Sequence, residues 1–170
     1  MRRSALFLAL SGVALATLIT PAAAKAQASI TATANVASTL GLSGDNDLDF
    51  QLVIPGFTKT VPVTDASAGA FSISGGPGAQ VTFSFTSLPA NLTDGGGNNL
   101  PITYTAVYNT ANDPATGNAL PLPGGAVDVL SPLGELFIFL GGTVDAIGPP
   151  VPPNGTYTGT VTLTASYTGN

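Results

Sequence analysis

The sequence predicts an all-β fold, specifically an antiparallel β-sandwich of immunoglobulin-like type. Three observations support this. Apolar and polar residues alternate with period two in many short runs, which is the pattern of half-buried strands. Clusters of Gly, Pro, Asn and Asp separate these runs, and the chain holds 21 Gly and 14 Pro. Beyond the N-terminal stretch no segment shows the 3.6-residue period of an amphipathic helix.

The first 26 residues have the order of a secretory signal peptide. Arg2 and Arg3 precede an apolar run over 5–19, and Ala24-Lys25-Ala26 fits a small-residue cleavage site. Ala26-Gln27-Ala28 fits as well, so cleavage after residue 28 is the alternative. A transmembrane anchor is less favoured, because the run is shorter than the roughly 20 residues that a spanning helix needs. We therefore expect an exported protein whose mature chain has no membrane span.

Residues 27–38 are expected to form an N-terminal strand or donor extension. The apolar positions of this alternation are Ala28, Ile30, Ala32, Ala34 and Val36. Such a strand can pair within its own sheet, or it can complete an exposed sheet edge of a neighbouring subunit. The alternation leaves both possibilities open.

The β-sandwich domain is expected over residues 39–170. Runs of alternation predict strands over 48–54, 59–63, 71–74, 81–86 and 102–108. In the first of these, Leu48, Phe50, Leu52 and Ile54 would share one face. The run 136–140 is apolar on both faces, which predicts a central strand buried on both sides.

Turn residues punctuate these strands. Gly75-Gly76-Pro77-Gly78 predicts a hairpin connection, and 94–99 (DGGGNN) predicts a flexible loop. The proline-rich stretch 148–153 should be stiff and extended. The least regular part, 109–132, is expected to be a long loop with one short strand near 126–130.

The longest alternation lies near the C-terminus. Its apolar face consists of Tyr157, Gly159, Val161, Leu163, Ala165 and Tyr167. Threonine and serine fill the opposite face, where β-branched Thr favours an extended backbone without adding charge. A one-residue slip would bury the Thr face, so the register is strongly specified. We expect a C-terminal edge strand carried by Tyr157, Val161, Leu163 and Tyr167.

The composition excludes most catalytic chemistry. The chain has no His and no Cys, so it has no imidazole or thiolate metal site, no Ser–His or Cys–His pair and no disulfide. We expect no enzyme activity, catalytic residue or cofactor. Asp45, Asp47 and Asp49 have the spacing that opens a calcium loop, but Phe50 and Gly56 stand where Gly and a bidentate Glu are needed. We interpret them as a polar turn.

Charge excludes a further class of partner. After signal removal one lysine, Lys59, faces nine acidic residues, a net charge of −8. Nucleic acid would repel such a surface. No nucleic-acid partner is therefore expected.

Several motifs carry a family resemblance. "AGAFSISGGPGAQVTFSF", "LTDGGGNN", "LGGTVD" and "NGTYTGTVTLTASY" together resemble a bacterial family of secreted domains of unknown function. The last strand, with Gly155, Tyr157 and Tyr167, is similar to that of chaperone–usher pilins and spore-coat protein U-like subunits. The resemblance implies that a periplasmic chaperone reads this strand, and that the extension 27–38 completes the next subunit's fold.

These observations lead to two functional hypotheses. The first is an exported structural subunit of a bacterial surface fibre or coat, assembled by β-strand addition. Its partners would be copies of itself, a periplasmic chaperone and an outer-membrane usher. The second is a monomeric secreted binding module for a polysaccharide or an envelope protein. Tyr104, Tyr108, Tyr157 and Tyr167 are candidates for a carbohydrate-binding face, although tyrosines in strands also pack into cores.

Overall fold

The computed structural model describes Thr31 and residues 39–145 and 151–168. The chain divides into two units, Met1–Asn35 and Val36–Asn170, and every strand described belongs to the second. The predicted signal peptide, 1–26, lies outside the described residues. So do the predicted donor positions Ile30, Ala32, Ala34 and Val36.

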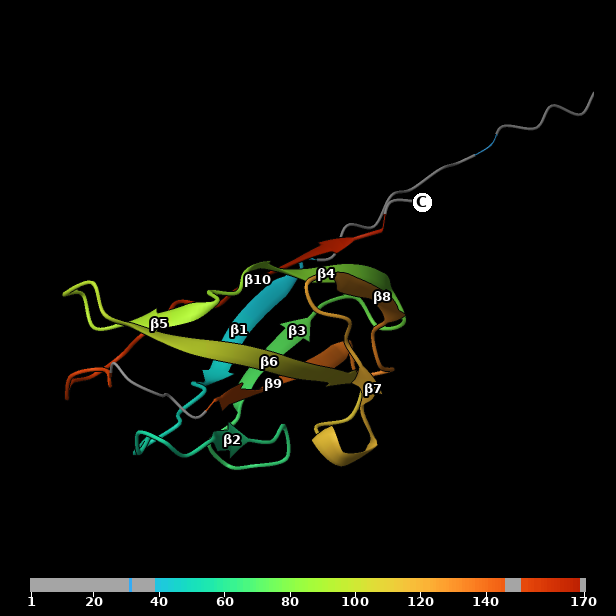
Figure 1. The fold of residues 1–170 in the computed structure, drawn as a ribbon. Helices are drawn as coiled ribbons and strands as arrows, with labels where there is room; N and C mark the ends of the chain where they lie inside the picture. Colours follow the sequence, from blue (N-terminus) through green and yellow to red (C-terminus); the bar gives the residue numbers. More distant parts are fainter. Residues whose placement is uncertain (1–30, 32–38, 146–150, 169–170) are drawn as a thin grey trace, which may run out of the picture. The chain divides into compact units, whose positions relative to one another are not determined.

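The described residues form an all-β fold of antiparallel strands in two sheets, which confirms the predicted class (Figure 1). The strands are β1 (Gly41–Asn46), β2 (Lys59–Val61), β3 (Gly69–Ser74), β4 (Gln80–Ser87), β5 (Asn91–Thr93), β6 (Asn99–Asn109), β7 (Asn118–Ala119), β8 (Gly125–Val129), β9 (Glu135–Val144) and β10 (Thr162–Tyr167), with a short 3₁₀ turn, η1 (Pro114–Thr116). The larger sheet has the order β1-β3-β9-β6-β5, to which β2 and β7 add short pairings. The smaller sheet has the order β10-β4-β8.

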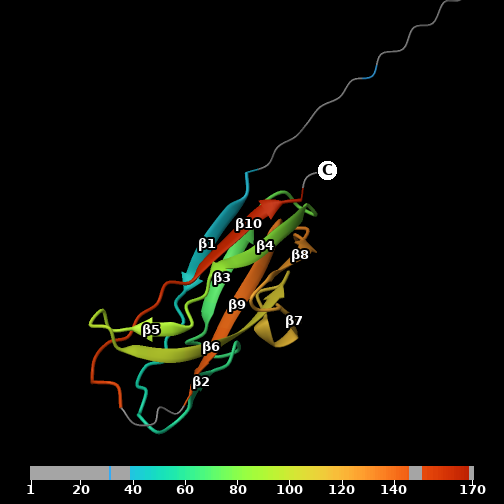
Figure 2. The same cartoon turned by 45° about the horizontal axis from the view of Figure 1, so that its top comes forward.

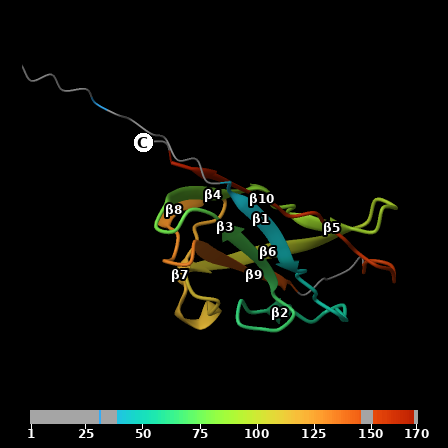
Figure 3. The same ribbon diagram turned by 180° about the vertical axis from the view of Figure 1, so that it is seen from behind.

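Strand β9 is the centre of the larger sheet, as the apolar run 136–140 predicts. It pairs with β3 on one side and with β6 on the other (Figure 3). Leu136, Ile138 and Leu140 are buried to 1% exposure or less. A strand with neighbours on both sides and covered faces needs apolar residues at successive positions, which is the pattern of this run.

The core consists of two apolar clusters. The larger one joins the sheets through side chains of β3, β4, β9 and β10, among them Ile73, Val81, Phe83, Ile138 and Leu163. The smaller one contains Phe50, Val61, Ala68, Leu100, Ile102 and Val144. Tyr104 packs against both clusters and so lies where they meet.

Most predicted elements are confirmed. The runs 81–86 and 102–108 fall in β4 and β6, 71–74 falls in β3, and the expected short strand near 126–130 is β8. The run 59–63 gives only the three residues of β2. Of the predicted loop 94–99, residues 94–98 connect the antiparallel pair β5 and β6, and Asn99 begins β6. The Asp94 carboxylate organises this turn by accepting hydrogen bonds from the amides of Gly96 and Asn98.

The predicted strand over 48–54 is wrong, because this segment is not in a strand. The Asp49 carboxylate accepts a hydrogen bond from the Gln51 amide at 2.7 Å, and Gln51 takes a left-handed φ of 55°. An Asp side chain that bonds the backbone two residues on makes a local turn that competes with extended structure. The alternation is broken at this point, so Phe50 is buried whereas Leu52 is 76% exposed.

The predicted hairpin at 75–78 is also wrong. It connects β3 of the larger sheet to β4 of the smaller one, so the chain crosses between sheets there. Strand β3 already pairs with β1 and β9, which leaves no edge for a hairpin partner. The Gly75 amide donates instead to the carbonyl of Gly134.

The long C-terminal alternation gives a shorter strand than predicted. Regular pairing with β4 begins at Thr162, and upstream of it Thr158 makes an isolated bridge with Thr93. The predicted division of faces holds along β10: Leu163 is buried and Ala165 is half-buried, whereas the threonines at 162 and 164 are exposed.

Candidate functional site

Two sheet edges lie next to each other on one side of the domain. Strand β1 is an edge of the larger sheet and β10 is an edge of the smaller one. Figures 1 and 2 both show these strands side by side, with arrowheads at opposite ends. They do not pair with each other. Each therefore presents backbone donors and acceptors that no strand of the described residues satisfies.

Both edge strands have a register irregularity. In β1 the pairing with β3 shifts between Gly44 and Asn46, and in β10 the pairing with β4 shifts between Thr162 and Leu163. Such bulges bend a strand and increase its local twist. Gly44 and Asn46, on either side of the irregularity in β1, line a groove, and the irregularity in β10 lies directly after the last lining residue, Val161.

The groove has a volume of about 1030 Å³. One wall is formed from residues 44–55, which are the end of β1 and the segment after it. The other wall is residues 152–161, which lead into β10. The floor is the inner face of the larger sheet together with β5, and its main side chains are Phe71, Leu92, Leu100, Ile102, Tyr104 and Leu140.

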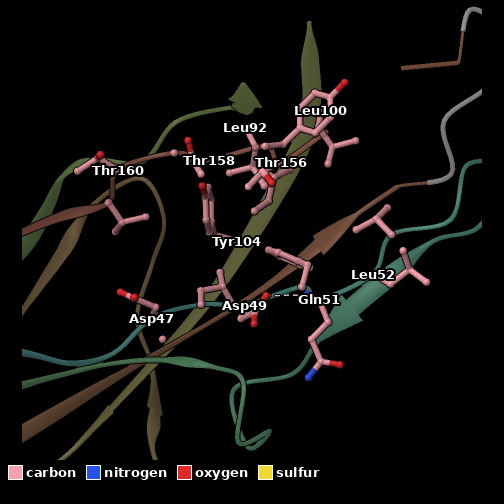
Figure 4. Close-up of a pocket in the computed structure, with 18 of the residues that line it drawn as sticks. Asp47, Asp49, Gln51, Leu52, Leu92, Leu100, Tyr104, Thr156, Thr158 and Thr160 are labelled. Carbon is pink, nitrogen blue, oxygen red and sulfur yellow. Dashed lines mark hydrogen bonds between the residues drawn. The ribbon is translucent and has the colours of Figure 1, made fainter. Parts of the chain in front are cut away.

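The Tyr104 ring occupies the middle of the groove. Figure 4 shows it between Asp49 on one wall and Thr158 on the other, with its hydroxyl toward the Thr158 side. Among the described residues, this hydroxyl is buried and has no hydrogen-bond partner. Burial raises the pKa of the phenol above its usual value of 10.0. A buried polar atom without a partner is unusual in a folded protein.

The wall 44–55 is held by only a few hydrogen bonds. The Asp49 amide donates to the carbonyl of Ser67 at 2.9 Å, and the Gln51 side chain donates to the Ser67 hydroxyl at 3.2 Å. The Asp49–Gln51 turn is visible in Figure 4 as a dashed line. The amides of Leu52 and Val53 make no hydrogen bond to any described residue. This wall therefore contains backbone that is free to pair.

Asp45, Asp47 and Asp49 lie near this wall but do not make a metal site. Over residues 39–145 and 151–168, no three His, Cys, Asp or Glu side chains come close enough to hold an ion. The Asp49 carboxylate is already used by the Gln51 amide. The carboxylates contribute negative charge to one side of the groove instead.

The wall 152–161 is tied to the domain at two points: Thr158 pairs with Thr93, and the Ser87 hydroxyl donates to the carbonyl of Thr160. Within the wall, the Tyr157 hydroxyl donates to the carbonyl of Pro153 at 2.9 Å. Burial, and to a smaller extent the charge of Asp94, raises the pKa of Tyr157. This wall bends at residues 154–155 and is anchored against β5 and the end of β4.

The four residues predicted for the C-terminal edge strand do not form one site. Tyr157 and Val161 line the groove. Leu163 is 5% exposed and belongs to the core. Tyr167 packs against the same core, and its hydroxyl accepts a hydrogen bond from the Gly76 amide at 2.9 Å. Tyr167 thus anchors the crossing between β3 and β4.

Sequence reasoning did not identify the groove floor. Phe71, Tyr104 and Leu140 come from three predicted strands and have the ordinary pattern of core residues. They face a groove, one wall of which includes the segment 48–54 that does not form the predicted strand. No signal in the sequence marks them apart from other inward-facing positions.

Comparison of the sequence with models of known protein families and with curated proteins finds no match to either. In the described parts of the chain, no helix has the length and hydropathy of a membrane span. The similarity to pilin-like subunits accordingly stays a prediction, and any assignment of function depends on the groove itself.

Proposed function

We propose that this chain is an exported, non-catalytic structural subunit of a surface fibre or coat, assembled by β-strand addition. The observation that carries the proposal is the groove between β1 and the residues leading into β10, where two sheet edges are open on the same side. An extended segment added there would pair with free backbone and cover an apolar floor.

The proposed occupant is residues 28–36 of a neighbouring copy. Nine extended residues span about 30 Å, and the groove is lined by residues from both walls, 44–55 and 152–161, along which such a segment could lie. Alternate positions of the segment would face the floor. These are mostly alanines, and small side chains suit a floor that Phe71, Tyr104 and Leu140 already fill.

Charge supports the same occupant. Residues 27–38 contain no charged side chain. Burying an unpaired charge in a groove is costly, and Asp47 and Asp49 on one wall would add repulsion for an acidic segment. An uncharged, alternating segment avoids both penalties.

The sequence just before β1 favours the segment of a neighbouring copy, over the chain's own segment, as the occupant of the groove. To fold back beside β1, the chain would need a tight turn at 37–40. Its residues there are Ala, Ser, Thr and Leu, none of which is typical of hairpin turns. Leu40 also packs against the core, which fixes the start of β1. We therefore assign the groove to the segment of a neighbouring copy.

The same proposal includes the partners that the resemblance implies. Before assembly, the open groove and the β10 edge would need protection from unwanted pairing. A periplasmic chaperone would provide it, and an outer-membrane usher would order the subunits. Export by the predicted signal peptide 1–26 would bring the chain to that compartment.

Deletion of residues 27–38 tests the proposal. Every described strand begins at Gly41 or later, so the shortened chain should stay folded and soluble but should not polymerise. The intact mature chain should give ladders on SDS gels that heating abolishes. An intact chain that never forms ladders, together with a deletion that unfolds a monomer, would refute assembly by strand addition.

A second candidate function is binding of polysaccharide by the monomer. The groove walls carry the hydroxyls of Thr156, Thr158 and Thr160, which are suited to contact sugar hydroxyls. This alternative predicts a monomer at all concentrations that binds a glycan. Thr158→Val should then weaken glycan binding, whereas Thr164→Val on exposed β10 should not.

A further inference from the structure

The wall segment after β1, residues 48–54, has the alternating sequence of a strand but is not a strand in the structure. If residues 48–54 were extended, Leu48, Phe50, Leu52 and Ile54 would share one face. In the structure, Leu48 and Phe50 pack inward as that pattern requires, but Leu52 and Ile54 are 76% and 54% exposed. Val53 packs on the smaller core cluster in their place. The alternation therefore shifts by one residue after Phe50.

Gln51 is where the shift occurs. It is the one residue other than glycine with a positive φ, 55°, among the described residues. Side chains with a Cβ are disfavoured in this region, and the Asp49 carboxylate compensates by bonding the Gln51 amide. Residues held in such conformations cluster at functional sites, which include ligand clamps and switch regions.

The segment borders the groove that the proposed function fills. Leu52 and Val53 both line this groove, and their amides have no partner among the described residues. An inserted strand would offer those amides carbonyl partners. It would also offer the exposed side chains of Leu52 and Ile54 an apolar surface to cover.

From this we infer that residues 47–55 are a latent strand. Filling of the groove by residues 28–36 of a second copy converts Gln51 from the left-handed to the extended conformation. The segment then continues β1, Leu52 and Ile54 turn toward the occupant and Val53 turns outward. This inference rests on the proposed function. It adds that the receiving subunit changes shape and that Gln51 sets the energy of the change.

Substitutions at Gln51 should change assembly in opposite directions. Gln51→Gly removes the Cβ that disfavours the turn, so it stabilises the empty groove and should raise the concentration for half-maximal assembly about fivefold or more. Gln51→Val disfavours positive φ and favours an extended backbone, so it should lower that concentration by a similar factor. Sedimentation of the full mature chain over a concentration series measures both.

Leu52→Ser tests the predicted burial. The side chain is exposed in the empty form, so its loss should leave the unfolding of dilute monomer unchanged while weakening assembly. The matched control is Leu133→Ser, which removes an equally exposed leucine, 81%, that does not line the groove. It should change neither property.

Amide hydrogen exchange of the unmodified chain gives a reading that needs no variant. The amides of Leu52 and Val53, which have no partner among the described residues, should exchange rapidly in dilute monomer and become protected in assembled material. Assembly without this protection, or Gln51→Gly and Gln51→Val shifting assembly in the same direction or not at all, would overturn the latent strand and leave strand addition standing.

The remaining outcomes separate the inference from the function. A chain that is monomeric at every concentration, with the Leu52 and Val53 amides unprotected, would overturn both. A monomer in which these two amides are protected would refute exchange between subunits but support the latent strand, with the chain's own residues 28–36 as the occupant.

Discussion

Replacing Tyr104 by Phe should stabilise the isolated subunit. The change removes one hydroxyl and keeps the ring that packs on both core clusters. This hydroxyl is buried and has no partner in the described structure. An unsatisfied buried polar group costs about 1–3 kcal/mol. The residue as a whole is only half-buried, so we expect the lower end of that range, about 1 kcal/mol. For a domain of this size, that gain raises Tm by about 3–5 °C.

Thermal and urea unfolding of dilute mature chain measure the effect. Tyr108→Phe is the matched control, since Tyr108 lies on the same strand and is half-buried. Its ring contact with Phe83 would be kept, and its hydroxyl is not a buried, unpartnered atom. It should stay within about 0.5 kcal/mol of the unmodified chain. Loss of stability in Tyr104→Phe would show that the hydroxyl has a partner and would refute the reasoning.

Stability at high pH gives an independent reading of the same group. Burial raises the pKa of Tyr104 above 10.0, so the unfolded chain loses its proton first as the pH rises. The contribution of this group is present below pH 10.0 and is lost between that value and the raised pKa. In the unmodified chain stability should therefore fall above pH 10.0, and Tyr104→Phe should reduce that fall. Equal slopes in the two chains would contradict burial of the phenol.

Three further substitutions test the rest of the domain. Leu163→Ala should lower the free energy of unfolding by about 2–5 kcal/mol because the side chain is in the core. Thr164→Ala, on the exposed face of β10, should lower it little. Equal midpoints of urea unfolding for the two variants would show that the register of β10 is wrong. Tyr167→Phe removes the acceptor of the Gly76 amide and should cost about 0.5–1.5 kcal/mol in the same assay. Asp94→Ala should lower stability at neutral pH, because hydrogen bonds from Asn98 hold the pKa of this carboxylate below 3.8. That contribution is present above pH 3.8 and is lost as the pH falls through the lowered pKa, so the two chains should converge in acid; a constant difference would contradict it.

Much of the fold could be predicted because each of these strands can be recognised from the pattern of its own residues. The run Leu136–Leu140 has to be central, since only a strand covered on both faces tolerates apolar residues at every position. The strands β4 and β6 follow directly from alternation. Neither inference requires knowledge of which strands are neighbours.

The failures have specific physical causes. Apolar and polar residues do alternate over 48–54. However, the Asp49 carboxylate accepts a hydrogen bond from the Gln51 amide and makes a turn, which the periodicity of the sequence does not reveal. At 75–78 a glycine-rich turn serves a hairpin or a crossing between sheets equally well. The choice depends on β3 having both edges paired, which is a property of the whole sheet.

The candidate groove could not be predicted for the same reason. Its floor residues have the pattern of core residues, and one wall includes a segment that does not form the strand its alternation predicts. Tyr157 and Val161, chosen from the last alternation, do lie on a groove wall. Leu163 and Tyr167, chosen by the same rule, lie in the core, because β10 becomes regular only at Thr162. Alternation identifies a face but not what covers it.

The lack of protection on these edges bears on which function is correct. Monomeric β-proteins protect edge strands with lysine, proline or inward-pointing charge. Strand β10 has none of these, and Lys59, the single basic residue from 39 to 168, lies in β2. Strand β1 carries Asp45 and a bulge, but both lie at the end where the groove opens. A domain that worked alone would be exposed to sheet-to-sheet aggregation along β10. A domain whose edge is covered by a partner's strand needs no such protection, and the proposed strand addition would provide this cover where the added segment continues from the groove along β10.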